Sequence, residues 1–188
     1  MKKILYIYGF NSSPEESSTF KMLKELMAAD PYCYDVISVK YDQTNPERGL
    51  EQLEEAVRRE KPVAVIGSSL GGFFAMNLST TVPVLVINPC LKPTVELPKL
   101  GGNGECYKDI EDRFYRSYYN NDFPVNHLED VFGFFATNDE LFSYAKEFHE
   151  LFSGRTYVGG HHPTKENLKA MRPEIHKQIV WPLHARKI

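Results

Sequence analysis

The chain has 188 residues, enough for one domain with a sizeable core, and 42% of them are apolar and 25% charged, as in ordinary globular proteins. A net charge of −3 and the lack of any apolar run near the ~20 residues of a membrane span argue against a nucleic-acid-binding or membrane-spanning protein. Three widely spaced cysteines without a CxxC pair indicate no zinc ribbon or redox motif, so we expect a cytoplasmic protein.

Short apolar runs alternate with helical patterns along the chain. Continuously apolar strands with helices between them predict a mainly parallel sheet covered on both faces, which is a three-layer α/β architecture of about six strands. The predicted strands are 4–8, 36–39, 63–66, 82–87, 131–136 and 155–158. The predicted helices are 15–29, 46–61, 70–78, 140–152 and 165–180, the last with a break or restart at Pro173.

The segment 89–129 interrupts this alternation with about forty residues between two predicted strands. Its aromatic residues include Phe114 and Tyr118, which are spaced for one face of a short helix. A loop of this length in a compact domain is usually functional, so we expect a small cap-like insertion over the site, within a single domain spanning 1–188. The alternative, that these aromatic residues pack on the body as additional core, stays open.

The strongest local signal is Gly67-Ser68-Ser69-Leu70-Gly71-Gly72, directly after the predicted strand 63–66. It matches G-x-S-x-G in a strand–turn–helix setting, the nucleophile elbow that exposes a serine hydroxyl at the top of an α/β-hydrolase sheet. The glycines leave room where the strand and helix approach, and the amide of Leu70 lies at a helix N-terminus that favours negative charge. The pattern predicts Ser69 as the nucleophile of a serine hydrolase. A glycine-rich turn without chemistry is the alternative.

A serine nucleophile needs a base that a carboxylate orients, and in this fold the acid and then the histidine follow the serine in the chain. Asp139 follows the predicted strand 131–136, and His161 and His162 follow 155–158. Parallel strands place their carboxyl ends at one edge of the sheet, so we expect these residues near Ser69. Asp139 is the predicted acid, and one of the two histidines is the predicted base.

Other roles for these side chains stay open. Asp139 could instead cap the helix predicted from Glu140, and the histidines could be ordinary loop residues or metal ligands. A metal site would need a third and a fourth ligand, and neither H-E-x-x-H nor a cysteine–histidine spacing is present. We therefore expect no metal and no cofactor.

The loop after the first strand is the expected source of a second oxyanion donor. Gly9 permits a close turn there, so the backbone amide of Phe10 is the candidate partner of the Leu70 amide. The candidate lining of the substrate pocket is Tyr8, Asn11, Tyr115 and Tyr118.

These motifs together resemble the YqiA family of small esterase-like α/β-hydrolases. The resemblance spans nearly the whole chain except 91–129. It implies an α/β-hydrolase fold and hydrolysis of a carboxylic ester or thioester without a cofactor. The markers are Gly9-Phe10-Asn11-Ser12-Ser13-Pro14, Gly67-Ser68-Ser69-Leu70-Gly71-Gly72, Asn88-Pro89, Asp139-Glu140, and Gly159-Gly160 with His162.

The resemblance also implies which histidine is the base. The family pattern has Gly-Gly-Asn-His before the last helix, which gives His162 the base position and puts His161 in place of the asparagine. The family usually has His-Gly-Phe where this chain has Tyr8-Gly9-Phe10, a difference that leaves the backbone amide of Phe10 in place.

The predicted function is hydrolysis of a small-molecule ester or thioester through an acyl-enzyme on Ser69, with an apolar acyl group indicated by the aromatic cap. In this hypothesis His162 takes the serine proton and Asp139 holds the imidazole. The alternative is a non-catalytic hydrolase-like protein or a flavodoxin-like binding protein, since the latter shares the alternation of strands and helices. No G-x-G-x-x-G or Walker lysine pattern supports nucleotide binding.

Overall fold

The structure is a computed structural model that describes residues 1–119 and 130–181. These residues form a six-stranded sheet in the order β2-β1-β3-β4-β5-β6, in which every pair of neighbouring strands is parallel. The prediction of a mainly parallel sheet of about six strands is confirmed. The strands are β1 (Lys3–Ile7), β2 (Asp35–Ile37), β3 (Ala64–Ser68), β4 (Val84–Ile87), β5 (Val131–Ala136) and β6 (Ser153–Tyr157).

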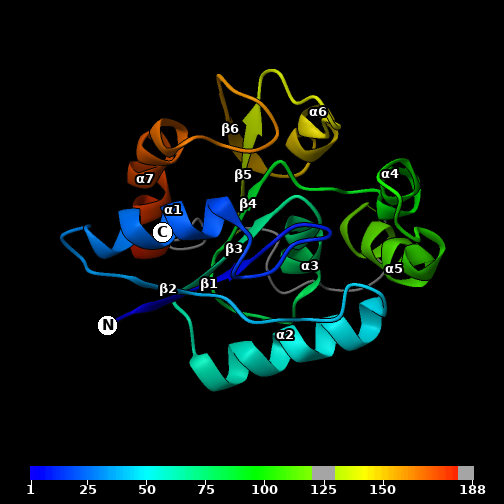
Figure 1. Cartoon of the computed structure of the whole chain (residues 1–188), viewed down its shortest axis with the longest axis horizontal. Helices are drawn as coiled ribbons and strands as arrows, with labels where there is room; N and C mark the ends of the chain where they lie inside the picture. Colours follow the sequence, from blue (N-terminus) through cyan, green and yellow to red (C-terminus); the bar gives the residue numbers. More distant parts are fainter. Residues whose placement is uncertain (120–129, 182–188) are drawn as a thin grey trace.

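Helices cover both faces of this sheet (Figure 1). The first and last helices pack against each other on one side, and α2 and α3 lie on the other, so the sheet is the middle of three layers. None of the helices in the described ranges is both long and apolar enough to cross a membrane. The helices are α1 (Ser18–Ala28), α2 (Pro46–Glu60), α3 (Leu70–Asn77), α4 (Pro93–Lys99), η1 (Glu105–Tyr107, 3-10), α5 (Lys108–Tyr119), α6 (Ala145–His149) and α7 (Lys165–Val180).

The core lies on both faces of the central strands. Every residue of β3, β4 and β5 is buried, as expected for parallel strands covered by helices on each side. The edge strand β6 is exposed or half-buried instead.

The strand order places a crevice between β1 and β3. The chain leaves β1 for β2 on one side of it and then crosses back to β3 on the other, so the order reverses there. Ligands of open α/β sheets bind outside the carboxyl ends of the strands at such a reversal. The loop that starts at Tyr8 and the turn at Ser69 both lie at this edge.

The helix predicted over 140–152 is wrong in extent, because only α6 is helical there. The carboxylate of Asp139 accepts hydrogen bonds from the amides of Leu141 and Phe142, at 3.0 and 3.1 Å, and these hold a turn in place of the first helical residues. Asp139 therefore does not cap a helix.

The break predicted at Pro173 is also wrong, because α7 is continuous through this residue. Proline removes one backbone hydrogen bond, but the helix starts with a capping box between Thr164 and Asn167. Leu168 and Ile175 are fully buried on the side that packs on the body. Capping and burial offset the cost of the proline.

The described part of the segment 89–129 packs beside α3, and its aromatic residues lie in the core. Tyr107, Phe114 and Tyr118 are buried, and the Phe114 ring centroid lies 5.4 Å from that of Phe73. These aromatic residues therefore pack on the body as additional core, which was one of the two possibilities that the sequence left open. Residues 120–129 of the predicted cap lie outside the described residues.

The close crossing of α3 over β1 yields a stability prediction. A β-carbon at Gly71 would lie 2.1 Å from the carbonyl oxygen of Ile7 and 2.5 Å from that of Tyr8. Gly71→Ala should lower the free energy of unfolding by about 1–3 kcal/mol in urea denaturation, because the helix must move off the strand. The exposed Ser79→Ala variant is the control, with an expected change within about 0.5 kcal/mol. An unchanged midpoint for Gly71→Ala would contradict the crossing.

Candidate active site

Ser69 occupies a strained turn between β3 and α3. Its φ of 54° and ψ of −125° cost a non-glycine residue about 1–3 kcal/mol, so the surrounding structure must hold it. The Ser69 amide donates to the carbonyl of Ile87 at 3.0 Å, and the Ser69 carbonyl accepts from the Cys90 amide at 3.0 Å. A β-carbon at Gly67 would lie 2.3 Å from the carbonyl oxygen of Gly71. This geometry is that of a nucleophile elbow.

The carboxylate of Asp139 pairs with His161. The Nδ1 atom of His161 lies 2.8 Å from Oδ2 and 3.0 Å from Oδ1 of Asp139, and the two side chains are only 1% and 2% exposed. Burial acts to raise the pKa of Asp139, but the His161 contact and the two backbone amides outweigh it and lower the pKa below its ordinary value. The carboxylate is therefore ionised near neutral pH and favours a proton on Nδ1.

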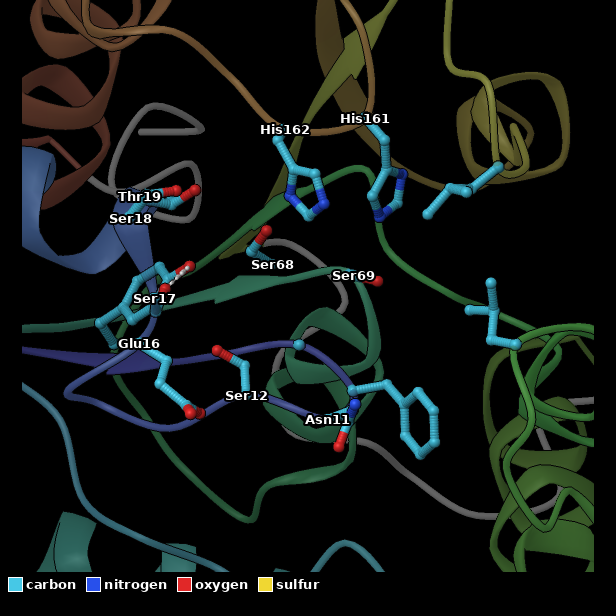
Figure 2. A pocket seen from close by; sticks show the side chains of 15 residues that line it. Asn11, Ser12, Glu16, Ser17, Ser18, Thr19, Ser68, Ser69, His161 and His162 are labelled. Atoms are coloured by element: carbon cyan, nitrogen blue, oxygen red, sulfur yellow. Dashed lines mark hydrogen bonds between the residues drawn. The ribbon is translucent and has the colours of Figure 1, made fainter.

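The second ring nitrogen of His161 differs from Nδ1 in its surroundings. Nε2 is buried and has no hydrogen-bond partner among the described residues. Figure 2 shows the His161 ring above Ser69 and the His162 ring above Ser68, and all four residues line one cavity. With the proton on Nδ1, the lone pair of Nε2 is available on the Ser69 side of that cavity.

The structure corrects the expected pairing of Asp139 with His162. Asp139 contacts the preceding residue, and the His162 ring packs edge-on against that of His161 with centroids 5.2 Å apart. Burial and the neighbouring His161 both lower the pKa of His162. His162 lines the cavity without touching the carboxylate that was expected to orient it.

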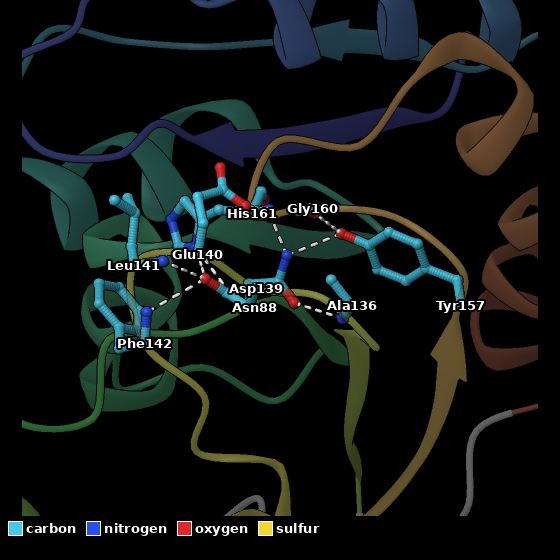
Figure 3. Close-up of polar contacts among 9 residues, drawn as sticks. All are labelled: Asn88, Ala136, Asp139, Glu140, Leu141, Phe142, Tyr157, Gly160 and His161. Carbon is cyan, nitrogen blue, oxygen red and sulfur yellow. Dashed lines mark hydrogen bonds and ion pairs between the residues drawn. The ribbon is translucent and has the colours of Figure 1, made fainter.

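A set of hydrogen bonds around the backbone of His161 explains why Asp139 contacts this histidine and not His162 (Figure 3). The Glu140 carboxylate accepts from the His161 amide at 2.9 Å, and the Asn88 side-chain amide donates to the His161 carbonyl at 2.7 Å. Asn88 also donates to the Tyr157 hydroxyl at 2.7 Å and accepts from the Ala136 amide at 2.8 Å. Three neighbouring strands thus hold residue 161 at Asp139.

Asn88 and Glu140 were missed as site residues in the sequence. In the sequence they were noted only within the family markers Asn88-Pro89 and Asp139-Glu140. The signal available in the sequence was an asparagine directly after a predicted buried strand. In the structure this asparagine has a positive φ of 44°, a backbone conformation that asparagine adopts more readily than most residues.

The candidate oxyanion donors belong to two segments next to Ser69. A β-carbon at Gly9 would lie 3.1 Å from the β-carbon of Ser69, so the loop after β1 passes directly against the serine. Phe10 follows in this loop, and Leu70 begins α3. Within the described ranges, neither amide donates a hydrogen bond to another residue. Both are therefore available to a negatively charged oxygen.

The cavity at this edge has a volume of about 340 Å³ and is open to solvent. Of the four predicted pocket residues, Asn11 lines it. No three His, Cys, Asp or Glu side chains in residues 1–119 and 130–181 are grouped to hold a metal ion. The cavity is lined by Tyr6, Gly9, Phe10, Asn11, Ser12, Glu16, Ser17, Ser18, Thr19, Ser68, Ser69, Leu100, Leu141, His161 and His162.

The other three predicted pocket residues lie elsewhere, which corrects the expectation. Tyr8 is buried against Tyr41, with ring centroids 4.9 Å apart. The hydroxyl of Tyr115 donates to Glu147 at 2.9 Å, and that of the buried Tyr118 donates to the carbonyl of Met76. Tyr115 and Tyr118 lie away from the cavity because the described part of the segment 89–129 packs beside α3, and Tyr8 belongs to the core.

Comparison with known proteins places this chain among hydrolase folds. The model of an uncharacterised protein family, UPF0227, matches residues 3–179. The esterase domain of a Rhodothermus marinus protein has a TM-score of 0.68 at 13% identity, covering 95% of this chain and 87% of that one. Est1E from Butyrivibrio proteoclasticus has a TM-score of 0.65 at 12% identity, covering 92% and 87%. The ydeN gene product of B. subtilis has a TM-score of 0.64 at 15% identity, covering 96% and 99%. The likeness shows the α/β-hydrolase fold.

The contacts of Asn88 predict a measurable role in holding the loop. Asn88→Ala leaves the His161 carbonyl and the Ala136 amide without their partner, which should cost about 1–3 kcal/mol, or roughly 3–10 °C in Tm. Thermal unfolding measures this. The exposed Asn138 at the end of the next strand is the matched control, and Asn138→Ala should shift Tm little. Equal shifts in the two variants would show that Asn88 does not stabilise the loop.

Proposed function

The chain belongs to UPF0227, the YqiA family that its motifs resemble, and from that premise we propose that it is a serine hydrolase of carboxylic esters or thioesters. The observation that carries the proposal is the Asp139–His161 pair, whose unpartnered Nε2 shares a cavity with the strained Ser69. The esterase domain from Rhodothermus marinus, which shares the fold, supports the reaction class by analogy. His161 replaces His162 as the proposed base.

Acylation uses the residues as the geometry arranges them. Nε2 of His161 takes the proton of the Ser69 hydroxyl while Oγ attacks the carbonyl carbon of the substrate. The amides of Phe10 and Leu70 stabilise the oxyanion, and Asp139 stabilises the imidazolium. The protonated Nε2 then gives its proton to the leaving alcohol or thiol, which departs and leaves the acyl group on Ser69.

Deacylation repeats these steps with water. His161 takes a proton from the water, which attacks the acyl-enzyme and releases the acid, and the proton returns to Ser69. No hydrogen bond joins Ser69 to His161 in this structure. Such contacts often form or tighten only when substrate is bound.

A non-catalytic binding protein is the rival that the topology alone does not separate. The order β2-β1-β3-β4-β5 is also that of flavodoxin-like sheets. The strained serine and the buried Asp139–His161 pair favour the hydrolase, because neither is needed to bind a ligand.

Ser69→Ala tests the nucleophile. Turnover of p-nitrophenyl esters should fall roughly 10³-fold or more, and labelling by a fluorophosphonate probe should be lost, because both need the serine oxygen. Ser79→Ala, a serine at the far end of α3, is the control and should keep both. If the probe does not label the wild-type protein, the binding-protein alternative is favoured. If Ser69→Ala keeps full turnover, Ser69 is not the nucleophile.

The two adjacent histidines provide an internally matched test of the base. His161→Gln should lower kcat by roughly 10³-fold or more, since the ring that Asp139 orients is lost. His162→Gln should lower it by less than about tenfold, because His162 makes no contact with the acid. Steady-state kinetics on one p-nitrophenyl ester measures both. The opposite order of effects would restore His162 as the base.

A further inference from the structure

One wall of the cavity is built almost entirely of small polar side chains. Ser12 comes from the loop after β1, Ser18 and Thr19 from the first turn of α1, and Ser68 from the end of β3. Figure 2 shows Ser18 and Thr19 on the same side of the cavity as Ser68. A substrate on this side therefore meets hydroxyl groups rather than the apolar surface expected of a cap.

Several of these polar groups have no partner within the protein. The side chains of Asn11, Ser12 and Ser18 make no hydrogen bond to another described residue. The Ser17 hydroxyl, in contrast, is used to cap the Phe20 amide at 3.2 Å. The wall therefore offers both donors and acceptors to a ligand.

Another set of cavity residues is apolar. Leu100 and Leu141 line it while each remains 40% exposed, which leaves apolar surface at the opening. Phe10 belongs to the same set, and its ring lies against Gly102, where a β-carbon would be 2.6 Å away. Leu141 follows the acid Asp139 closely, so this surface lies near the candidate catalytic residues. It suits a short hydrocarbon group.

The charged residues that line the cavity restrict the chemical class of the substrate further. Among the described residues that line the cavity there is no lysine or arginine, and Glu16 is the one carboxylate. A phosphate- or carboxylate-bearing substrate would meet a negative charge and no compensating cation. The exposed Glu16 carboxylate is instead an acceptor for hydroxyl groups. The volume of about 340 Å³ also lies near the lower end for ligand sites.

We infer that the substrate is a small ester of a polyol that carries no anionic group, with several hydroxyl groups on the alcohol and a short apolar acyl chain. This inference rests on the proposed hydrolase activity. The alcohol part lies against Ser12 and Ser18 of the polar wall and against Glu16 beside them. The acyl chain lies on Phe10, Leu100 and Leu141. Water adds to the acyl carbon, the ester C–O bond breaks, and the products are the free polyol and a short carboxylic acid.

A matched pair of esters tests the wall. 2,3-Dihydroxypropyl butyrate and propyl butyrate differ only in two hydroxyl groups, and the former should have at least a tenfold higher kcat/KM, about the effect of one well-placed hydrogen bond. Butyryl-CoA, whose phosphates would meet the Glu16 carboxylate, and butyrylcholine, whose alcohol part offers no free hydroxyl group to the wall, should both be poorer substrates than the dihydroxypropyl ester.

The variants Ser18→Ala and Glu16→Gln should each lower the preference for the dihydroxypropyl ester over propyl butyrate to below about threefold. Both residues are exposed, so the fold should tolerate these changes. Ser79→Ala lies outside the cavity and should keep the full preference.

The outcomes separate this inference from the proposed function. Turnover of p-nitrophenyl butyrate that depends on Ser69, with equal kcat/KM for the matched pair, would overturn the polyol assignment and leave the hydrolase intact. A higher kcat/KM for butyryl-CoA or butyrylcholine than for the dihydroxypropyl ester would likewise overturn the polyol assignment and leave the hydrolase intact. No turnover of any ester would overturn both.

Discussion

The backbone strain at Ser69 is the constraint on which the candidate site depends. A non-glycine residue with φ of 54° persists only where its neighbours hold it, and here Ile87 at the end of β4 and Cys90 just after it do so. The same turn needs α3 to cross β1 at Gly71 within van der Waals distance. That crossing brings the loop containing Gly9 against the serine. The proposed nucleophile and both candidate oxyanion donors are therefore positioned by one packing arrangement.

The position of the proposed base depends on a separate set of contacts. Asn88 and Glu140 hold the backbone of residue 161 from two neighbouring loops, and the side chain at that position reaches Asp139. The His162 ring lies on the Ser68 side of the cavity instead (Figure 2). A shift of one residue changes which imidazole the acid can orient. This is why the loop contacts matter as much as the histidines themselves.

The polar character of the cavity follows from the path of the segment 89–129. Its aromatic residues Tyr107 and Phe114 pack on Phe73 of α3, where they add to the core. Its described part contributes Leu100 to the cavity, and the first turn of α1 also lines it. The described lining of the small cavity therefore combines apolar residues with a hydroxyl-bearing wall. The amphipathic lining is what directs the proposal toward polyol esters.

The sequence by itself determined the features that depend on local pattern. Alternating apolar runs predicted the parallel sheet, the glycine spacing predicted the turn at Ser69, and the parallel order predicted that Asp139 and the histidine pair lie at one edge. Tertiary structure alone decided between His161 and His162, because that choice depends on Asn88, more than seventy residues away. It likewise decided the positions of Tyr8, Tyr115 and Tyr118. Composition and spacing describe which residues are apolar or reactive, whereas side-chain direction and long-range hydrogen bonds arise only when distant segments pack.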